Sequence, residues 1–146
     1  KLSTDMGRDA LLQSLAKAAL AANKPQKARE YAEKMLSQNS PGWNYGNNIH
    51  HGNIILGRIA LSLDDLEEAK KRLINAGKTP GSPQLNSFGP DMALAKELLQ
   101  KGEKDVVLEY FELCSKFWKS GKDRLDKWSV VVKDGKIPDF GFNLNR

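Results

Sequence analysis

Two adjacent histidines, His50 and His51, lie in the polar segment 42–53 and are the residues best suited to acid–base or metal chemistry. Neighbouring side chains on a helix point about 100° apart, whereas helical metal pairs are spaced three or four residues apart so that both reach one ion. The Glu of the helical zinc-protease motif is also missing here. We therefore expect a helix start in which Asn side chains cap the first turn and Trp43 packs against the body.

Cys114 is the only cysteine, so an internal disulfide and a cysteine-based zinc site are both excluded. It falls in an apolar run with Phe111 and Phe117, and no base stands near it in the sequence, which favours a small core residue over a nucleophile. A Gly-rich phosphate loop, a Gly-x-Ser-x-Gly elbow and a dinucleotide fingerprint are all missing. We therefore predict no catalytic residue, no metal and no cofactor, and a protein that is not an enzyme.

The 146 residues carry 23 Lys and Arg against 18 Asp and Glu, a net charge of +5, and 40% of them are apolar. This composition predicts one globular domain over residues 1–146. No apolar run approaches the roughly 18 residues that a membrane-spanning helix needs. The basic segment 116–136 interleaves cations with Trp and Phe, but its acids and its helical spacing favour a solvated helix face, so nucleic acid is not an expected partner.

One pattern of small and apolar residues occurs three times, and the elements that must position any site follow it. A small residue stands twelve positions before an apolar one in each copy: Ala16 and Ala28, Gly57 and Ala69, Ala95 and Val107. Apolar residues at steps of three and four on either side of a polar turn predict a helical hairpin in each copy. The turns are expected at 23–25, 64–65 and 102–104. A small side chain lets the two helices approach closely, so Gly57 should face Ala69.

The stretches 56–61 and 64–69 resemble a tetratricopeptide repeat, whose pattern sets a Leu-Gly pair, a small or aromatic residue three positions later, and a Glu-Ala pair after an acidic turn. The resemblance implies an all-α fold, an α-α superhelix of about three divergent hairpins at roughly 9–40, 50–80 and 88–118, with a capping helix and tail at 119–146. Corresponding positions are 41 and 38 residues apart, more than the family period of about 34. Extra loop is therefore inserted between the hairpins.

A cation directly follows the small residue in every copy: Lys17, Arg58 and Lys96. The resemblance implies that the first helices line a concave groove, which would place these cations toward a ligand, with Gln13 nearby and His51 at a groove-facing position. Charge-assisted bonds from Lys and Arg are the stronger class, so we expect a non-enzymatic scaffold that binds a protein or peptide, with acidic or carboxylate-ended segments as the favoured ligands. Three cations on a solvated face are the simpler alternative.

The extra residues fall at 37–48 and 77–90, and the second segment is expected to be non-helical because it holds three glycines and three prolines. Leu85 and Phe88 should pin this loop to the body. A rival function is a small-molecule or catalytic site under the two loops. Its residues would be Trp43, Tyr45, His50, His51 and Phe88. A structural fragment that packs against the rest of a longer protein, or against an identical copy, is the third alternative.

The stretch from 121 to 134 places Leu125, Trp128 and Val132 on one face, which predicts a capping helix over the apolar end of the stack. Gly135 should end this helix. We expect the remaining tail to be non-helical and to fold back through Phe140 and Phe142.

Overall fold

Three helical hairpins and one further long helix make up the structure. The computed structural model describes residues 2–38 and 44–144. The hairpins are α1 (Leu2–Ala21) with α2 (Pro25–Leu36), α3 (Tyr45–Ser62) with α4 (Leu66–Gly77), and α6 (Ala93–Gln100) with α7 (Lys104–Ser115); α8 (Lys122–Lys133) follows a short turn of 3-10 helix at Lys119–Gly121. The described residues form no strand, which confirms the all-α prediction. None of their helices combines the length and the apolar character that crossing a membrane requires.

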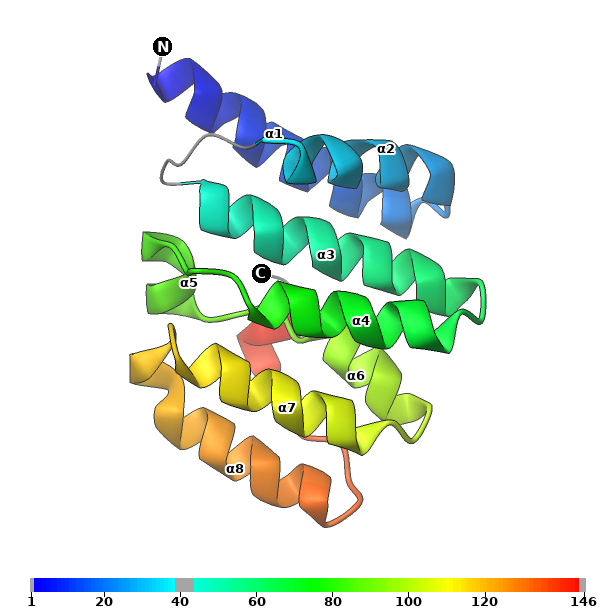
Figure 1. Ribbon diagram of the computed structural model, residues 1–146, viewed down its shortest axis with the longest axis vertical. Coiled ribbons are helices and arrows are strands. Elements are labelled where there is room, and N and C mark those ends of the chain that lie inside the picture. The colour runs from blue at the N-terminus through cyan, green and yellow to red at the C-terminus, as the bar shows by residue number, and fades with distance from the viewer. Residues whose placement is uncertain (1, 39–43, 145–146) are drawn as a thin grey trace.

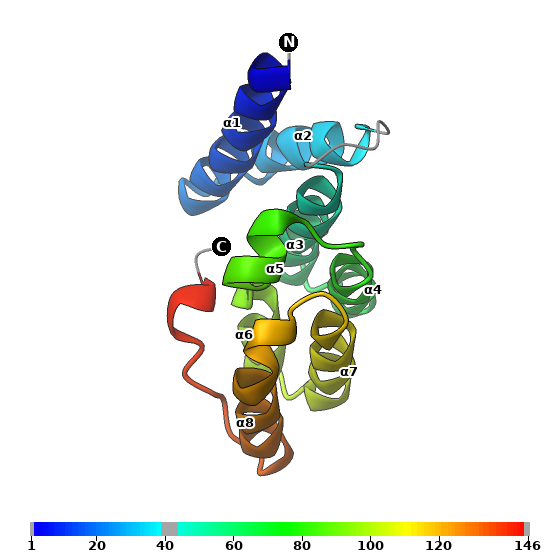
Figure 2. The same ribbon diagram turned by 90° about the vertical axis from the view of Figure 1, so that its left-hand side faces the viewer.

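The hairpins are stacked along the long axis of the molecule, from α1 and α2 at one end to α8 at the other (Figure 1). In the side view, α2, α4 and α7 lie along one side, the C-terminal segment lies on the opposite side, and the short helix α5 (Pro83–Phe88) lies between them, toward the viewer (Figure 2). α3 packs against both α2 and α4, and α4 packs against α7, so neighbouring hairpins bury each other's apolar faces. We call the side that carries α1, α3 and α6 the inner face.

The same C-terminal cap ends the first helix of every hairpin. The second residue after each helix adopts a left-handed φ: 57° at Asn23, 59° at Asp64 and 82° at Gly102. In the first turn, Lys24 N–H donates to Ala19 O at 2.8 Å, and the other two turns contain the equivalent bond. This is the Schellman arrangement, which satisfies carbonyls that a helix end would otherwise leave unpaired. The three predicted turns are thereby confirmed.

The small residues of the repeated pattern lie where helices cross. Four of them have no exposed surface: Ala16, Ala28, Ala69 and Ala95. Gly57 was expected to face Ala69, but a Cβ on it would overlap Leu94 of α6 and would stand 3.0 Å from Arg72 Cβ of α4. The room that this glycine provides therefore serves the contact between the second and third hairpins as much as the contact within its own hairpin.

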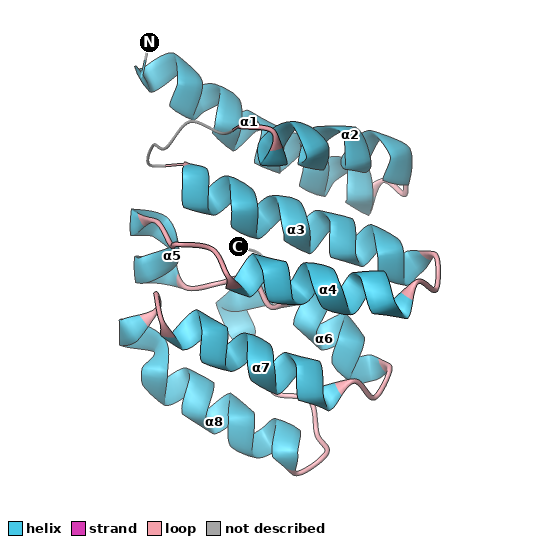
Figure 3. Ribbon diagram, viewed as in Figure 1, coloured by secondary structure: helices cyan, strands magenta, loops and turns pink. Residues whose placement is uncertain are grey.

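The segment 77–90 contains α5, so the prediction that this segment is non-helical was wrong (Figure 3). The side chain of Ser82 accepts a hydrogen bond from Leu85 N–H at 2.9 Å and caps the helix. Pro83 occupies the first helical position, where its fixed φ and missing N–H favour a helix start. Leu85 is buried as expected, but Phe88 is 55% exposed and does not pin the loop through burial.

The start of α3 also differs from the prediction. α3 begins at Tyr45, so the last residues of the segment 37–48 belong to a helix rather than to an inserted loop. Asn44 is the N-cap residue but its side chain makes no capping hydrogen bond, and Asn47 and Asn48 lie inside the helix, so the prediction of Asn caps was wrong. Trp43 lies outside the described residues.

α8 and the tail cover the end of the stack. α8 buries Leu125, Trp128 and Val132 and packs against α7, as predicted for this helix. The tail folds back through Phe140, which is buried with its ring centroid 5.0 Å from that of Trp128. Phe142 is 82% exposed, so its predicted contact was wrong, and Gly141–Leu144 forms a short 3-10 helix.

We expect the substitution Gly102→Ala to lower the free energy of unfolding by about 1 kcal/mol, because only the left-handed φ opposes a Cβ there and no other atom lies within 4 Å of it. Urea unfolding measures the change. Lys101→Ala, one residue earlier and with an ordinary φ, is the matched control and should change stability by less than about 0.5 kcal/mol. Equal stability of the two variants would contradict the assigned cap.

Candidate functional site

His50 makes one hydrogen bond within the second hairpin and one to the segment that leads into the third. Nδ1 lies 3.1 Å from the carbonyl oxygen of Ala76 in α4, and Nε2 accepts a hydrogen bond from Asp91 N–H at 2.9 Å. Because Nε2 accepts, the neutral ring carries its proton on Nδ1 and donates it to Ala76. Burial lowers the pKa of His50 to about 4. The imidazole is therefore neutral at pH 7, which this pair of hydrogen bonds requires.

Asp91 is buried just before α6 and is held by several groups. Its Oδ1 accepts from Ala93 N–H at 2.8 Å, and its carbonyl oxygen accepts from the Tyr110 hydroxyl at 2.7 Å. Its Oδ2 lies 3.9 Å from Nζ of Lys17 in α1. Burial raises the pKa of Asp91 to about 6, and the Lys17 ammonium acts in the opposite direction. This ion pair connects the first hairpin to the start of the third.

His51 packs against the ring of His50 and lines a pocket. The rings of His50 and His51 meet edge to face at an interplanar angle of 81°. His51 is only 5% exposed, yet its Nδ1 has no hydrogen-bond partner among the described residues. Burial lowers the pKa of His51, and His50 and Lys17 lower it further. A neutral imidazole can donate one hydrogen bond and accept another, and which nitrogen donates depends on its tautomer. Nδ1 of His51 is itself buried, so a ligand would reach it only if the side chains around it moved.

Asn47 attaches α5 to α3. Its Nδ2 donates to Gln84 Oε1 at 3.1 Å, and its Oδ1 accepts from Ser82 Oγ at 2.6 Å. The same Ser82 oxygen caps α5, so the start of this short helix is fixed to the side of α3. α5 therefore has a defined position although it holds only six residues.

A pocket of about 260 Å³ lies between α1, α3 and α5, and we call it the α1–α3–α5 pocket. Drug-sized ligands typically occupy pockets of about 300–1,000 Å³, so this one suits a single side chain, a chain end or a small molecule. Three amides, an ammonium group, an imidazole and an aromatic ring contribute to its lining. The full set of lining residues is Gln13, Lys17, Asn47, His51, Gln84, Leu85, Phe88 and Gly89.

Three of the five predicted ligand-binding residues line the α1–α3–α5 pocket, and two do not. Gln13, Lys17 and His51 come together in the α1–α3–α5 pocket. Arg58 lies elsewhere, where its Nε and Nη2 donate to the two carboxylate oxygens of Glu97 at 3.1 and 3.2 Å. Lys96 is half-buried on α6 and does not line the pocket. The predicted row of three cations is therefore not one cluster.

The residues of the rival site are divided as well. His51 and Phe88 line the pocket, but His50 is fully buried behind it and Tyr45 does not reach it. Asn47 and Gln84, which contact each other across 37 positions of the chain, were not predicted as pocket residues. The run of Asn residues beside the two histidines was a sequence signal for Asn47 only.

The side chains that line the pocket can form hydrogen bonds and ion pairs with a ligand. No described hydroxyl, thiol or carboxylate is hydrogen-bonded to the open nitrogen of His51. Cys114 is fully buried, and burial raises the pKa of its thiol, which confirms the predicted core role. Over residues 2–38 and 44–144, no group of three His, Cys, Asp or Glu side chains is placed to hold a metal ion.

Comparisons of the chain with protein-family models, with curated proteins and with solved structures gave no match. The tetratricopeptide-like assignment stays a prediction, and function has to be argued from the pocket itself.

We expect His50 to make the protein less stable in acid. The pKa of the ring is 6.5 when unfolded and about 4 when folded, so the unfolded chain binds more protons between these values. His50 should therefore remove about 2 kcal/mol of unfolding free energy between about pH 7.5 and pH 5. His50→Gln removes the titrating ring, so the variant does not lose this free energy. The difference in unfolding free energy between the wild type and the variant should therefore narrow by about 2 kcal/mol as the pH falls, and urea titrations measure it.

Asp91→Asn is the matched control, because its sign is opposite. The raised pKa of about 6 means that the folded chain binds the extra proton as the pH falls, so Asp91 adds stability in acid. Asp91→Asn removes this contribution, so the variant should lack about 1 kcal/mol of unfolding free energy that the wild type gains as the pH falls over the same range. If both variants shift the pH dependence in one direction, the assigned protonation states are wrong.

We also expect Gly46→Ala to destabilise the protein by about 1–3 kcal/mol. A Cβ on Gly46 would overlap the backbone carbonyl of Gly81, which cannot move aside as a flexible side chain can. Thr79 holds the two segments together, since its Oγ1 donates to Gly46 O at 2.7 Å. Thermal unfolding measures the effect, with the exposed substitution Ser87→Ala in α5 as the control. An unchanged melting temperature for Gly46→Ala would refute the close contact.

Proposed function

We propose that the protein is a non-enzymatic scaffold that binds a protein or peptide segment on its inner face, with the α1–α3–α5 pocket as the principal contact. The observation that carries this proposal is the convergence of Gln13 and Lys17 from the first hairpin with His51 from the second. These residues come from separate helices, so the packing of two hairpins sets their spacing before any ligand arrives. Such pre-organisation lowers the entropic cost of binding.

The proposed fold is a divergent tetratricopeptide-like superhelix. Three stacked hairpins, the same left-handed cap after each first helix, and fully buried alanines at the helix crossings support it. In a stack of this kind each repeat contacts mainly its neighbours, and the first helices together form an extended binding face. The α1–α3–α5 pocket lies on that face.

The proposed ligand is an acidic or carboxylate-ended segment. Lys17 supplies positive charge, and Gln13 and His51 supply hydrogen-bond donors around a space of about 260 Å³. A charged donor and neutral donors that converge on one small space match a carboxylate, which accepts several hydrogen bonds. The contribution of Arg58 and Lys96 stays a prediction, and a ligand would compete with Glu97 for Arg58.

A small-molecule site in the same pocket is the second candidate. The unpartnered Nδ1 of His51 favours it, because a buried polar atom without a partner is costly and a bound molecule would satisfy it. Thermal-shift screening of small carboxylic acids and heteroaromatic compounds tests this candidate separately from peptides.

The peptide proposal is tested by selection from a display library of random segments with free carboxyl ends, followed by titration of the enriched sequences as synthetic peptides. Gln13→Leu together with Lys17→Met keeps most of the apolar volume and removes the polar groups of the pocket. We expect this double variant to bind at least about tenfold more weakly, which is about 1.4 kcal/mol. For a peptide whose terminal carboxylate contacts the pocket, amidation of that carboxylate should weaken binding.

Lys71→Met is the matched control, because Lys71 is exposed on α4 and lies outside the pocket. It should change affinity by less than about twofold. Circular dichroism establishes that every variant is folded. If no sequence is enriched, or if the double variant and the control behave alike, the pocket is not a peptide site.

A further inference from the structure

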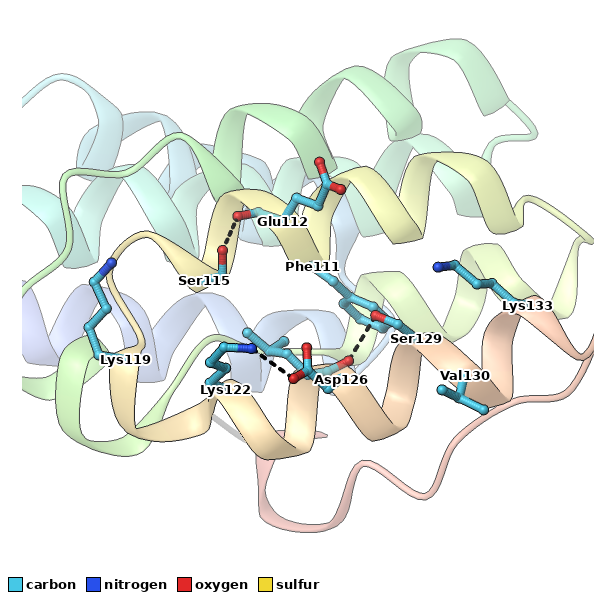
Figure 4. Close-up of a pocket in the computed structure, with 10 residues that line it drawn as sticks. Phe111, Glu112, Ser115, Lys119, Lys122, Asp126, Ser129, Val130 and Lys133 are labelled. Carbon is cyan, nitrogen blue, oxygen red and sulfur yellow. Dashed lines mark hydrogen bonds and ion pairs between the residues drawn. The ribbon is translucent and has the colours of Figure 1, made fainter.

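A second hollow lies toward the other end of the stack, between α7 and α8 (Figure 4). Its volume is about 590 Å³, and we call it the α7–α8 groove. Phe111 and Leu125 line its base from the two helices and are themselves buried, and Val130 at its side is 68% exposed. The lining residues of α8 run from Lys122 to Lys133, so the groove follows about three turns of this helix.

The position of the groove in the stack is that of a further outer helix. Each of the three hairpins has an outer helix of 12 residues: α2, α4 and α7. α8 ends with the same cap as the inner helices, since Gly135 has a φ of 81° and Lys136 N–H donates to Val131 O at 3.1 Å. After this cap the chain turns into the tail, and no described helix lies over the α7–α8 groove. The outer helix α4 packs on α3, and α7 packs on α6, but no described helix packs on α8 in the same way.

Positively charged side chains lie at both ends of the α7–α8 groove. Lys119 and Lys133 stand at its two ends (Figure 4), and neither forms an ion pair with a described residue. Lys122 is already bound to Asp126 at 2.9 Å, and the carboxylate of Glu112 points to the side of α7 away from α8. The two ammonium groups therefore lie at opposite ends of the groove, with Phe111 and Leu125 between them (Figure 4).

We propose that the α7–α8 groove binds an acidic amphipathic helix of another protein. The bound helix takes the place of a fourth outer helix: its apolar side covers Phe111, Leu125 and Val130, and acidic side chains near its two ends pair with Lys119 and Lys133. The outer helices of this chain show the pattern such a partner needs, with apolar residues at steps of four and three, such as Ala69, Leu73 and Ala76. Laying an amphipathic helix into an apolar groove is a common recognition mode. This surface is separate from the α1–α3–α5 pocket, so either proposal can fail alone.

Two synthetic helical peptides of about 16 residues test the proposal on the full chain. They share one face of Leu and Ala at steps of four and three, and they carry either Glu or Lys near both ends. Fluorescence anisotropy should show that the Glu peptide binds at least about tenfold more tightly than the Lys peptide, and that its affinity falls as salt is added. Equal affinities for the two peptides, or no binding of either, would overturn the proposal.

The variant Lys119→Glu with Lys133→Glu should reverse the preference, so that the Lys peptide binds more tightly. The matched control is Lys116→Glu with Lys127→Glu, which makes the same change in net charge at exposed residues outside the lining and should preserve the preference. Val130→Asp should weaken the Glu peptide at least about tenfold without unfolding the chain, because the side chain is exposed. Dimers in light scattering that Val130→Asp abolishes would show that a second copy fills the groove, which overturns the proposal.

Discussion

The arrangement of this protein depends on one buried imidazole. His50 reaches a carbonyl in α4 and an amide just before α6, groups that lie 26 and 41 residues away in the chain. Without the ring, the N–H of Asp91 would be buried and unpaired, at a cost of about 1–3 kcal/mol, whereas the Ala76 carbonyl oxygen would keep the N–H of Thr79 at 3.4 Å. Because one nitrogen must donate and the other accept, only the neutral ring with its proton on Nδ1 makes both bonds. The junction between the second and third hairpins therefore requires a histidine that stays uncharged.

The pocket follows from that junction. Since adjacent side chains on a helix diverge by about 100°, burying His50 between hairpins turns His51 toward α1 and α5. The peptide that His50 holds belongs to Asp91, whose carboxylate lies beside Lys17. One buried residue thus fixes α3, the start of α6 and the cation of the first hairpin relative to one another. An open nitrogen on His51 is the consequence of this geometry.

The sequence predicted what local chemistry determines. Turns with a left-handed residue, amphipathic helices and buried alanines depend on neighbours within one hairpin, and these features were found at the expected positions. The site was predicted only in part, because its partners are remote: Asn47 and Ser82 meet across 35 positions, and Arg58 finds Glu97 on another hairpin. Helix α5 was missed because glycine and proline were counted as breakers, whereas Pro83 after Ser82 is a helix start.

The tail explains why the two proposed surfaces lie apart. Asn143 donates to the carbonyl oxygens of Phe88 and Pro90 and accepts from Met92 N–H at 2.7 Å, so the tail binds the backbone that leads into α6. Phe140 fills the space beside Phe111 and Trp128. The chain's own residues thus cover the region next to α6, on the side opposite α4 and α7 (Figure 2). The α1–α3–α5 pocket stays open on one side of this covered region, and the α7–α8 groove stays open beyond it. No residue lines both sites, so an acidic ligand bound at one site would contact side chains that are absent from the other.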